Sequence, residues 1–592
     1  MPFPNPVRFL FSLAHLFSFA LCLLTLPMQA ATVGNPADPA GLPAAIQSAY
    51  AAGSRKIVLT PGKYTLPGGT DRASLTIRNL KNAEVDAYKV ELAMTDLKDC
   101  VVFENCQNVV FRGATVHYAV PHTGQGKILA LGSDTEGNYY DVQLDAGYPQ
   151  DADFKGAYII DPVTRHFKPG NSDMTAKSVT PLDVPGLTAP GKVRLRWDGD
   201  YGLPKNHWNV AVGDYVVCRG PGNTMLKDDG CDNCTFQDLM FYWGGVFGFF
   251  DIGGGRGNRF LHDTITYGPK PPGAVNAPLL SQSADGLHSP DARVGPDIER
   301  CLFEGNCDDG FAIHGYYEPV AASIGTSLTV KPRGGSTMFG PGEPIRVQND
   351  KTGFIADATV TAAAPAPDSP GAFVLTLDKP INAPDGSLAA DPARCGRGYK
   401  IIGNTVRNHR ARGMLLKADD GLVQGNLVDG STIAGIVVSP EAPDEAGYSH
   451  HVRIIGNTLR NTGYATTGSW APYAAAVTIY GNGSIGNQDI VIAGNTFDSI
   501  HGANLEVRYA RGVTIRSNRF LNTHQMPCDN GSGPGIDPAA VAWLGDCADV
   551  TLSDNWVRNQ GPYGKHLLTV TPSAVNVNGG KTGIQRAVLR KK

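Results

Sequence analysis

Two short stretches of the sequence place aspartate, glycine and histidine in the same order. Residues 283–288 read SADGLH and residues 307–314 read CDDGFAIH, so Asp285 and Asp309 are 24 residues apart and Asp308 adjoins Asp309. Carboxyl groups held close together can divide the roles of general acid and general base in the hydrolysis of a glycosidic bond. The chemistry depends on whether the fold brings these segments together.

A spacing of 24 residues is about one coil of a parallel β-helix, in which each coil stacks its strands on those of the coil below. Stacked strands lie ~4.8 Å apart. Acids one coil apart would therefore meet on one face of the solenoid.

A repeated phrase supports this architecture. It is built as apolar-Gly-Asn-x-apolar, and its lead asparagines are 22, 31, 38, 23 and 37 residues apart, which corresponds to bare coils and coils with an added loop. The lead residues are Asn404, Asn426, Asn457, Asn495, Asn518 and Asn555. Asparagine tolerates the left-handed backbone of tight turns, and stacked asparagines can hydrogen-bond in a ladder. The alternative is an antiparallel sandwich with asparagine turns, which the internal repetition disfavours. We therefore predict an all-β, right-handed parallel β-helix, with Cys234 and Cys301 packed inside its coils.

The phrase fails in two windows that carry alternating polar and apolar residues with Pro/Gly/Asp clusters. These windows predict two small antiparallel, barrel-like β modules inserted between coils. The second starts directly after the Asp308/Asp309 coil, so it should wall the site. The predicted divisions are 1–30 signal peptide, 31–118 N-terminal β-helix, 119–221 first module, 222–315 catalytic coils, 316–397 second module and 398–592 C-terminal β-helix.

Composition fits a large exported β protein. The chain has 592 residues, 71 of them glycine, with 18% charged residues and a net charge of −4, which gives no basic footprint for nucleic acid. Arg8, an apolar run over residues 9–26 and Ala30 predict a cleaved signal peptide. We expect a periplasmic or extracellular protein without a membrane span. The oligomeric state stays open, with a homodimer as one alternative.

The acid-glycine stretches, the two inserted modules and the segment ARGMLL at 411–416 leading to Gly425-Asn426 together resemble glycoside hydrolase family 110. The resemblance covers most of the chain, and its specific part is residues 283–315. It implies an exo-acting α-galactosidase that acts on terminal α-1,3-linked galactose and inverts the anomeric centre. It also implies that Asp285, Asp308 and Asp309 correspond to the family's acidic trio.

The chemistry of the trio can be considered separately. Inversion needs one protonated acid and one carboxylate that activates water, and clustered acids raise at least one pKa. Asp308 and Asp309 should point to opposite faces of a regular strand, which makes Asp285 the partner of one of them. The sequence leaves open which two residues are acid and base. It also leaves open that these acids only cap glycine turns or bind a structural ion.

Further residues could bind the substrate. Histidines near the acids could hydrogen-bond to sugar hydroxyls, aromatic rings could stack on a sugar, and charged residues on later coils could extend the groove; each could equally serve packing or solvation. These candidates are His288, His314, Tyr316, Trp243, Lys417, Glu441, Glu506 and Arg508.

Two other functions remain as alternatives. A β-helix polysaccharide lyase would use a lysine or arginine base beside a uronate, often with Ca²⁺, and Lys417, Arg412, Arg508 and Glu506 could supply the parts. A surface adhesin would explain the repeats but gives no reason to stack acids. The hydrolase needs no cofactor and no metal, and its partner would be a carbohydrate.

Overall fold

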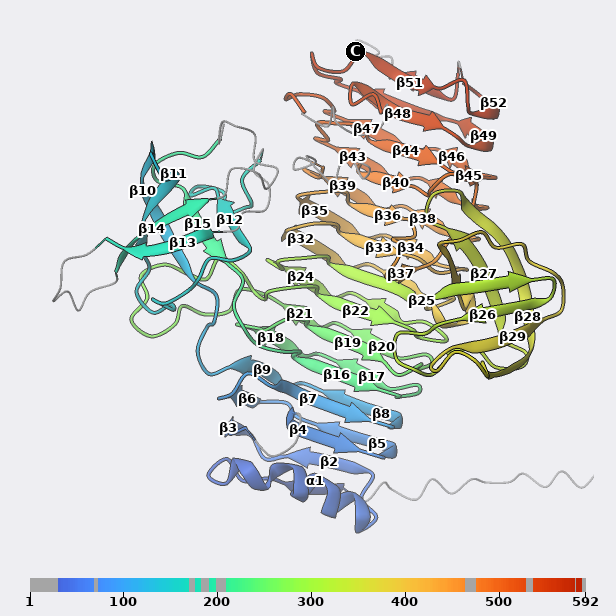
Figure 1. Cartoon of the computed structure of the whole chain (residues 1–592). Coiled ribbons are helices and arrows are strands. Elements are labelled where there is room, and N and C mark those ends of the chain that lie inside the picture. The colour runs from blue at the N-terminus through green and yellow to red at the C-terminus, as the bar shows by residue number, and fades with distance from the viewer. Residues whose placement is uncertain are drawn as a thin grey trace, which may run out of the picture.

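The computed structural model is a column of parallel coils with a module attached on each side (Figure 1). It describes residues 30–68, 73–169, 176–182, 191–197, 209–463, 475–528, 536–580 and 582–587. The predicted signal peptide therefore lies almost wholly outside the described residues. At the N-terminal end, α1 (Leu42–Ala51) covers the first coil and buries Leu42 and Ile46 in the core.

Three parallel sheets run along the column. The first contains β2 (Lys56–Leu59), β5 (Lys81–Asp86), β8 (Gln107–Arg112), β17 (Thr235–Gln237), β20 (Arg259–Leu261), β23 (Asp297–Glu299), β31 (Lys400–Ile402), β34 (Leu422–Gln424), β38 (Arg453–Ile455), β42 (Val491–Ala493), β46 (Thr514–Arg516) and β49 (Ala548–Ser553). The second contains β3 (Gly62–Leu66), β6 (Val90–Met94), β9 (Thr115–Tyr118), β18 (Met240–Tyr242), β21 (Thr264–Ile265), β24 (Leu302–Glu304), β32 (Thr405–His409), β35 (Leu427–Ser431), β39 (Thr458–Arg460), β43 (Thr496–Asp498), β47 (Arg519–Leu521), β50 (Asn555–Arg558) and β53 (Ile584–Arg586).

The third sheet carries the predicted site. Its strands are β4 (Ala73–Arg78), β7 (Asp99–Glu104), β16 (Leu226–Asp229), β19 (Phe249–Ile252), β22 (Leu287–Pro290), β25 (Phe311–Ile324), β33 (Met414–Leu416), β36 (Ile436–Val438), β40 (Val477–Ile479), β44 (Leu505–Arg508), β48 (Ala540–Gly545) and β51 (His566–Val570). Successive strands pair in parallel, for example Leu287 with Phe311 and Phe311 with Met414. The predicted all-β, right-handed parallel β-helix is confirmed.

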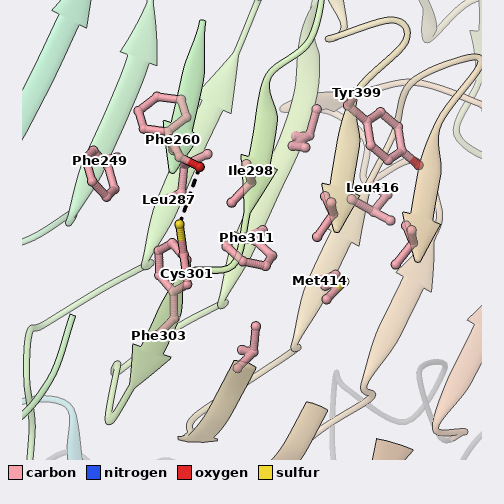
Figure 2. Packing of buried hydrophobic residues seen from close by; sticks show 14 of the residues in the cluster. Phe249, Phe260, Leu287, Ile298, Cys301, Phe303, Phe311, Tyr399, Met414 and Leu416 are labelled. Atoms are coloured by element: carbon pink, nitrogen blue, oxygen red, sulfur yellow. Dashed lines mark hydrogen bonds between the residues drawn. The ribbon is translucent and has the colours of Figure 1, made fainter. Parts of the chain in front are cut away.

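The core is the dry interior of the coils. Phe249, Leu287, Phe311 and Met414 follow one another on the inward face of the third sheet (Figure 2). Cys234 and Cys301 are buried in this interior, as expected. Side chains alternate between the two faces of each strand, so the residues next to these inward positions point to the outer face, where the site lies.

The asparagine ladder is confirmed, with one correction. Each lead side chain from Asn404 to Asn518 donates through Nδ2 to the Oδ1 of the lead asparagine of the next coil, at 2.9–3.0 Å. The left-handed backbone conformation is not at these asparagines. It falls on the preceding residue, such as Gly403 and Gly456, and on the trailing Asn408 and Asn461. Lead asparagines therefore serve the ladder, and their neighbours serve the turns.

The second inserted module is a closed antiparallel barrel. Its strands pair in the cycle β25, β26 (Ser327–Val330), β29 (Phe373–Leu377), β28 (Gly353–Pro365), β27 (Pro344–Asn349) and β30 (Ser387–Ala390). It has its own core, which includes Leu328, Val347 and Leu375. The buried Arg346 of β27 fixes the barrel to the coils by donating to the Tyr448 carbonyl at 2.9 Å and pairing with Asp419 at 3.3 Å.

The first inserted module is an antiparallel sheet in the order β12 (Ala157–Ile160), β15 (Tyr215–Cys218), β10 (Gln125–Asp134), β11 (Gly137–Leu144), β14 (Lys192–Trp197) and β13 (Ala176–Pro181). It also has its own core, which includes Ile128, Val142 and Leu195. Within the described residues its outer strands β12 and β13 do not pair, so the expected barrel closure is seen only in the second module.

Candidate active site

Asp285 and Asp309 lie side by side at the start of neighbouring strands of the third sheet. Each precedes by two residues the strand position where Leu287 of β22 pairs with Phe311 of β25. The backbone N–H of Asp309 donates to Oδ1 of Asp285 at 3.2 Å. Asp285, Asp308 and Asp309 each offer one carboxylate oxygen within 4.8 Å of the others. The 24-residue spacing thus does bring the three acids together.

Asp285 faces two histidines that are linked in a chain. Its Oδ2 lies 2.7 Å from Nδ1 of His288, and Nε2 of His288 lies 3.1 Å from Nε2 of His314. Nδ1 of His314 lies 2.8 Å from the carbonyl oxygen of Gly315. The ring of His288 also stacks on Phe247, with centroids 4.7 Å apart.

Hydrogen-bond roles fix the number of protons in this chain. A carbonyl oxygen only accepts, so Nδ1 of His314 must carry a hydrogen. Burial lowers the pKa of His314 to about 4, so its ring is neutral at pH 7 and its Nε2 accepts from Nε2–H of His288. One proton then remains between Nδ1 of His288 and Oδ2 of Asp285. Burial raises the pKa of Asp285, against the opposing effect of His288. Burial would lower the pKa of His288, but Asp285 raises it, so the pKa values of both groups that share this proton are raised.

Asp308 and Asp309 are held by arginines. Asp308 accepts from Arg410 at 2.6 Å and from Arg219 at 2.9 Å. Burial alone would raise the pKa of Asp308, but these two guanidinium groups outweigh it and the pKa is lowered. Asp308 is therefore an ionised carboxylate.

Arg412 binds Asp309 in a two-pronged contact. Its Nε and Nη2 donate to the two carboxylate oxygens at 2.9 and 2.8 Å, and its backbone N–H donates to Oδ1 at 2.8 Å. Burial nevertheless raises the pKa of Asp309 to about 7, with Arg412 opposing the rise. The trio thus combines one ionised acid, Asp308, with two acids of raised pKa, Asp285 and Asp309.

A network of charged residues connects Arg412, which binds Asp309, to His314, which contacts His288. Arg412 pairs with Glu441 at 2.5 Å, and the fully buried Lys417 pairs with Glu441 at 2.9 Å and Glu445 at 2.5 Å. Glu445 reaches back to within 3.9 Å of Nε2 of His314. Lys417 and Glu441, predicted as substrate contacts, lie here in a network that supports the trio from behind.

The remaining candidates differ in their distance from the acids. Tyr316 is 45% exposed, and its ring lies 5.8 Å from that of His314. Trp243 is buried beside His117 and Tyr242 and donates to the Pro269 carbonyl. Glu506 and Arg508 share the outer face of the third sheet, but their strand β44 lies beyond β36 and β40 from Lys417. The structure places His288 against Asp285, His314 against His288 and Tyr316 beside His314, whereas Trp243, Glu506 and Arg508 lie away from the acids.

Sequence reasoning missed Arg219, Arg410 and Glu445. Arg410 and Arg412 occupy the coil after Asp308 and Asp309, because Phe311 pairs with Met414 across the inserted barrel. Removal of the insert from the sequence would have aligned the two segments. Arg219 comes from the end of the first module, and no local pattern predicts that it reaches Asp308.

The three aspartate oxygens are close enough for a cation to bridge them. However, Arg219, Arg410 and Arg412 already place three positive charges against Asp308 and Asp309. This donor set favours neutralisation by arginine over a metal centre.

Comparison with known proteins finds curated relatives with one shared name. The chain is 27% identical over 292 residues to alpha-1,3-galactosidase B of Akkermansia muciniphila, a match that covers 46% of this chain and 35% of that protein. It is 24% identical over 430 residues to alpha-1,3-galactosidase A of Streptomyces avermitilis, covering 66% of this chain and 67% of that protein. Alpha-1,3-galactosidase A of Bacteroides thetaiotaomicron is 22% identical over 422 residues, with 67% and 71% covered. The resemblance to glycoside hydrolase family 110 is thereby confirmed, although the match spans only about a third of the first relative's length.

Other comparisons concern architecture alone. No protein-family model matches the chain. The A-module of a mannuronan C-5 epimerase from Azotobacter vinelandii has a TM-score of 0.41 at 12% identity and covers 93% of this chain and 96% of that one. An alpha-1,3-glucanase from Streptomyces thermodiastaticus has a TM-score of 0.39 at 12% identity, with 96% and 71% covered. Among the described residues, no helix is both long and apolar enough to span a membrane.

Proposed function

We propose that this protein is an exo-acting, inverting glycoside hydrolase that removes terminal α-linked galactose from glycans. The observation that carries the proposal is the cluster of the buried Asp285 and Asp309 with the half-buried Asp308, each of which places one carboxylate oxygen within 4.8 Å of the others. Curated relatives named alpha-1,3-galactosidase support the choice of sugar and linkage.

The two acids of raised pKa divide the work. Asp285 is the general acid, because one proton lies between its Oδ2 and Nδ1 of His288. It donates that proton to the glycosidic oxygen as the bond to the anomeric carbon breaks. Asp309, with a pKa near 7, accepts a proton from the water that attacks this carbon, and transfer of that proton back to Asp285 restores the site.

Asp308 neutralises the charges of Arg219 and Arg410 in this mechanism and does not itself transfer a proton. It stays ionised between Arg219 and Arg410 and keeps both guanidinium groups beside the sugar. Carboxyl groups of inverting enzymes are usually ~6.5–9.5 Å apart, which is longer than the nearest oxygen separation in the trio. The stereochemical outcome is therefore the most exacting test of the mechanism.

Exo action and export complete the proposal. The first module supplies Arg219, and β25 leads from His314 directly into the barrel, so inserts flank the acids on both sides and restrict the site to chain ends. The apolar segment at residues 9–26 supports export to the periplasm or beyond.

The lyase alternative is disfavoured by the position of its base. Lys417 is fully buried and paired with Glu441 and Glu445, and Arg412 is engaged by Asp309. Neither is available to take a proton from a uronate.

Incubation with a panel of α-galactosides and uronate polysaccharides tests the proposal. We expect galactose release from α-1,3-linked substrates, unaffected by exhaustive chelation. Ultraviolet-absorbing unsaturated products that need calcium would instead establish the lyase.

A further inference from the structure

An open pocket of about 450 Å³ lies where the barrel meets the coils, next to the candidate active site. Its walls come from β25, from the barrel segment after β26, and from the coils. The residues that matter here are Tyr316, Glu318, Arg333, Ser336, Arg394 and Asp444. The pocket exists only because the barrel is inserted at this coil.

A series of ring contacts links the pocket to the acids. The backbone of Tyr316 pairs with that of Glu445 between β25 and β37 (Glu445–Ala446), so this pocket residue lies next to the charge network of Lys417, Glu441 and Glu445. Its ring lies 5.8 Å from His314, whose ring is 4.9 Å from that of His288, the direct partner of Asp285. Two histidine rings therefore separate the ring of Tyr316 from Asp285.

Each guanidinium group at the pocket has a carboxylate partner. Arg333 pairs with Asp444, and Arg394 pairs with Asp291 at 3.3 Å. The carboxylate of Glu318 accepts from the Thr337 hydroxyl at 2.7 Å and the Met338 N–H at 2.6 Å. The two guanidinium groups are thus matched by the carboxylates of Asp444 and Asp291, and Glu318 adds a third carboxyl group, so the pocket has no excess positive charge and suits hydroxyl groups better than an anion.

The exposed ring of Tyr316 adds an apolar surface to this polar pocket. An aromatic face with a few convergent polar groups is typical of a site for a small ligand. The described pocket thus combines a stacking surface with hydrogen-bonding groups of both kinds, which is the chemistry of a neutral sugar.

We propose that this pocket binds the neutral sugar units that follow the terminal sugar of the substrate. The assignment of these sugars as part of the substrate rests on the proposed function, in which the terminal sugar is bound at the acids. The neutral ligand class rests on the pocket residues alone. The barrel then acts as a specificity module that selects long neutral glycans over short or acidic ones.

Binding can be measured without catalysis. The probe is lacto-N-neotetraose, a neutral tetrasaccharide without a terminal α-galactose, titrated calorimetrically into the full-length protein. Ser336 is exposed at the pocket, so Ser336→Trp should fill it without disturbing the barrel core. We expect its affinity to fall about tenfold or more, in line with the loss of a stacked contact and its neighbours.

Lys379→Trp is the matched control, since Lys379 is exposed on the same barrel and does not line the pocket. It should bind the tetrasaccharide like the wild type, and both variants should retain the wild-type melting temperature. A sialylated form of the probe should bind no tighter than the neutral one.

The outcomes separate the two proposals. Absence of tetrasaccharide binding, or binding that Ser336→Trp leaves unchanged, overturns the pocket. Tighter binding of the sialylated probe overturns its neutral ligand class. Binding sensitive to Ser336→Trp, in a protein that hydrolyses no α-galactoside, retains the pocket and overturns the proposed function instead.

Discussion

Asp285 and Asp309 hold equivalent positions on neighbouring coils, yet their surroundings differ in kind. Asp285 shares a proton with a histidine, whereas Asp309 is clamped by a guanidinium group. The asymmetry arises because the coil after Asp309 places Arg412 beside it. The coil before Asp285 places Phe247 there instead, and the ring of Phe247 stacks on His288. Identical backbone positions thereby acquire different protonation chemistry.

Asp285→Asn should separate catalysis from stability. Asparagine keeps an oxygen for the Asp309 N–H and offers Nδ2–H to Nδ1 of His288, as the protonated acid does. We expect kcat to fall by a factor on the order of 10² or more, because proton donation is lost. The melting temperature should stay within a few degrees of the wild type. Parallel measurement of kcat and thermal unfolding checks both.

Asp309→Asn provides the contrast, since it removes one of the two carboxylates that pair with the buried Arg412 and leaves only Glu441, so it should lower both kcat and melting temperature. Near-wild-type kcat in both variants would remove the acids from the mechanism.

Glu441 should give the protein an acid-sensitive component of stability. Burial would raise its pKa, but Lys417 and Arg412 lower it to about 2. An unfolded glutamate titrates near ~4.3, so the stabilisation is complete above that pH and is lost as pH falls from ~4.3 toward 2. Glu441→Gln should therefore be less stable than wild type by about 3 kcal/mol at pH 6 and by much less at pH 2.5.

Urea unfolding at the two pH values measures this difference. Asp444→Asn, which removes one partner of an exposed ion pair, is the control and should change little at either pH. A wild-type advantage that is the same at both pH values would contradict the role of Glu441.

The acids could be predicted from the sequence because one coil separates Asp285 from Asp309, and strand pairing converts that spacing into contact. The arginines could not all be found this way. Arg410 and Arg412 are hidden by the inserted barrel, and Arg219 arrives from a separate module, so only tertiary packing brings it to Asp308. Lys417 was singled out, but its burial behind the trio depends on Glu445, which carries no sequence signal.

At the scale of elements, the asparagine ladder should be the main polar support of the C-terminal coils. Oδ1 of Asn457 accepts from both the backbone N–H and Nδ2 of Asn426, each at 2.9 Å. Asn457→Ala leaves these buried donors without an acceptor, which costs about 1–3 kcal/mol. The melting temperature of the variant measures the loss.

Asn461→Gly is the matched control. Asn461 is exposed, has a positive φ that glycine also adopts, and makes one surface hydrogen bond to Asp429. It should melt close to the wild type. Equal melting of the two variants would contradict the ladder's role.

The repeat phrase predicted the coils well because each strand is short and its inward residue is fixed by stacking. It misplaced the left-handed backbone, since in a Gly-Asn pair either residue can form the turn. In the structure the glycine has the left-handed conformation and the asparagine forms the ladder. The closed barrel and the first module, whose described strands form a sheet without closure, have the same alternating pattern, so the sequence could not distinguish them.

At the scale of the molecule, the barrel should be removable. Pro319 and Leu388 are cross-strand partners, so a short turn can join them and replace residues 320–387. The remaining coils should fold and resist proteolysis, because the barrel has its own core. The melting temperature should fall moderately, since Asp419 loses Arg346. Limited proteolysis and circular dichroism check this.

Replacement of the whole segment 316–397 is the informative comparison. Tyr317, Leu388 and Ala390 pack in the core of the coils, so this longer deletion should be markedly less stable than the shorter one. Complete unfolding of the shorter deletion would contradict the autonomy of the barrel.

The central claim is that the aspartate trio hydrolyses terminal α-galactosides with inversion. A time course by proton NMR on an α-1,3-linked galactoside tests it most directly, because the anomeric signals of the first galactose released appear before mutarotation mixes them. The mechanism predicts β-galactose first with the wild type, and release slowed on the order of 10²-fold or more with Asp285→Asn. Release of α-galactose first, or no release of galactose at all, would contradict it.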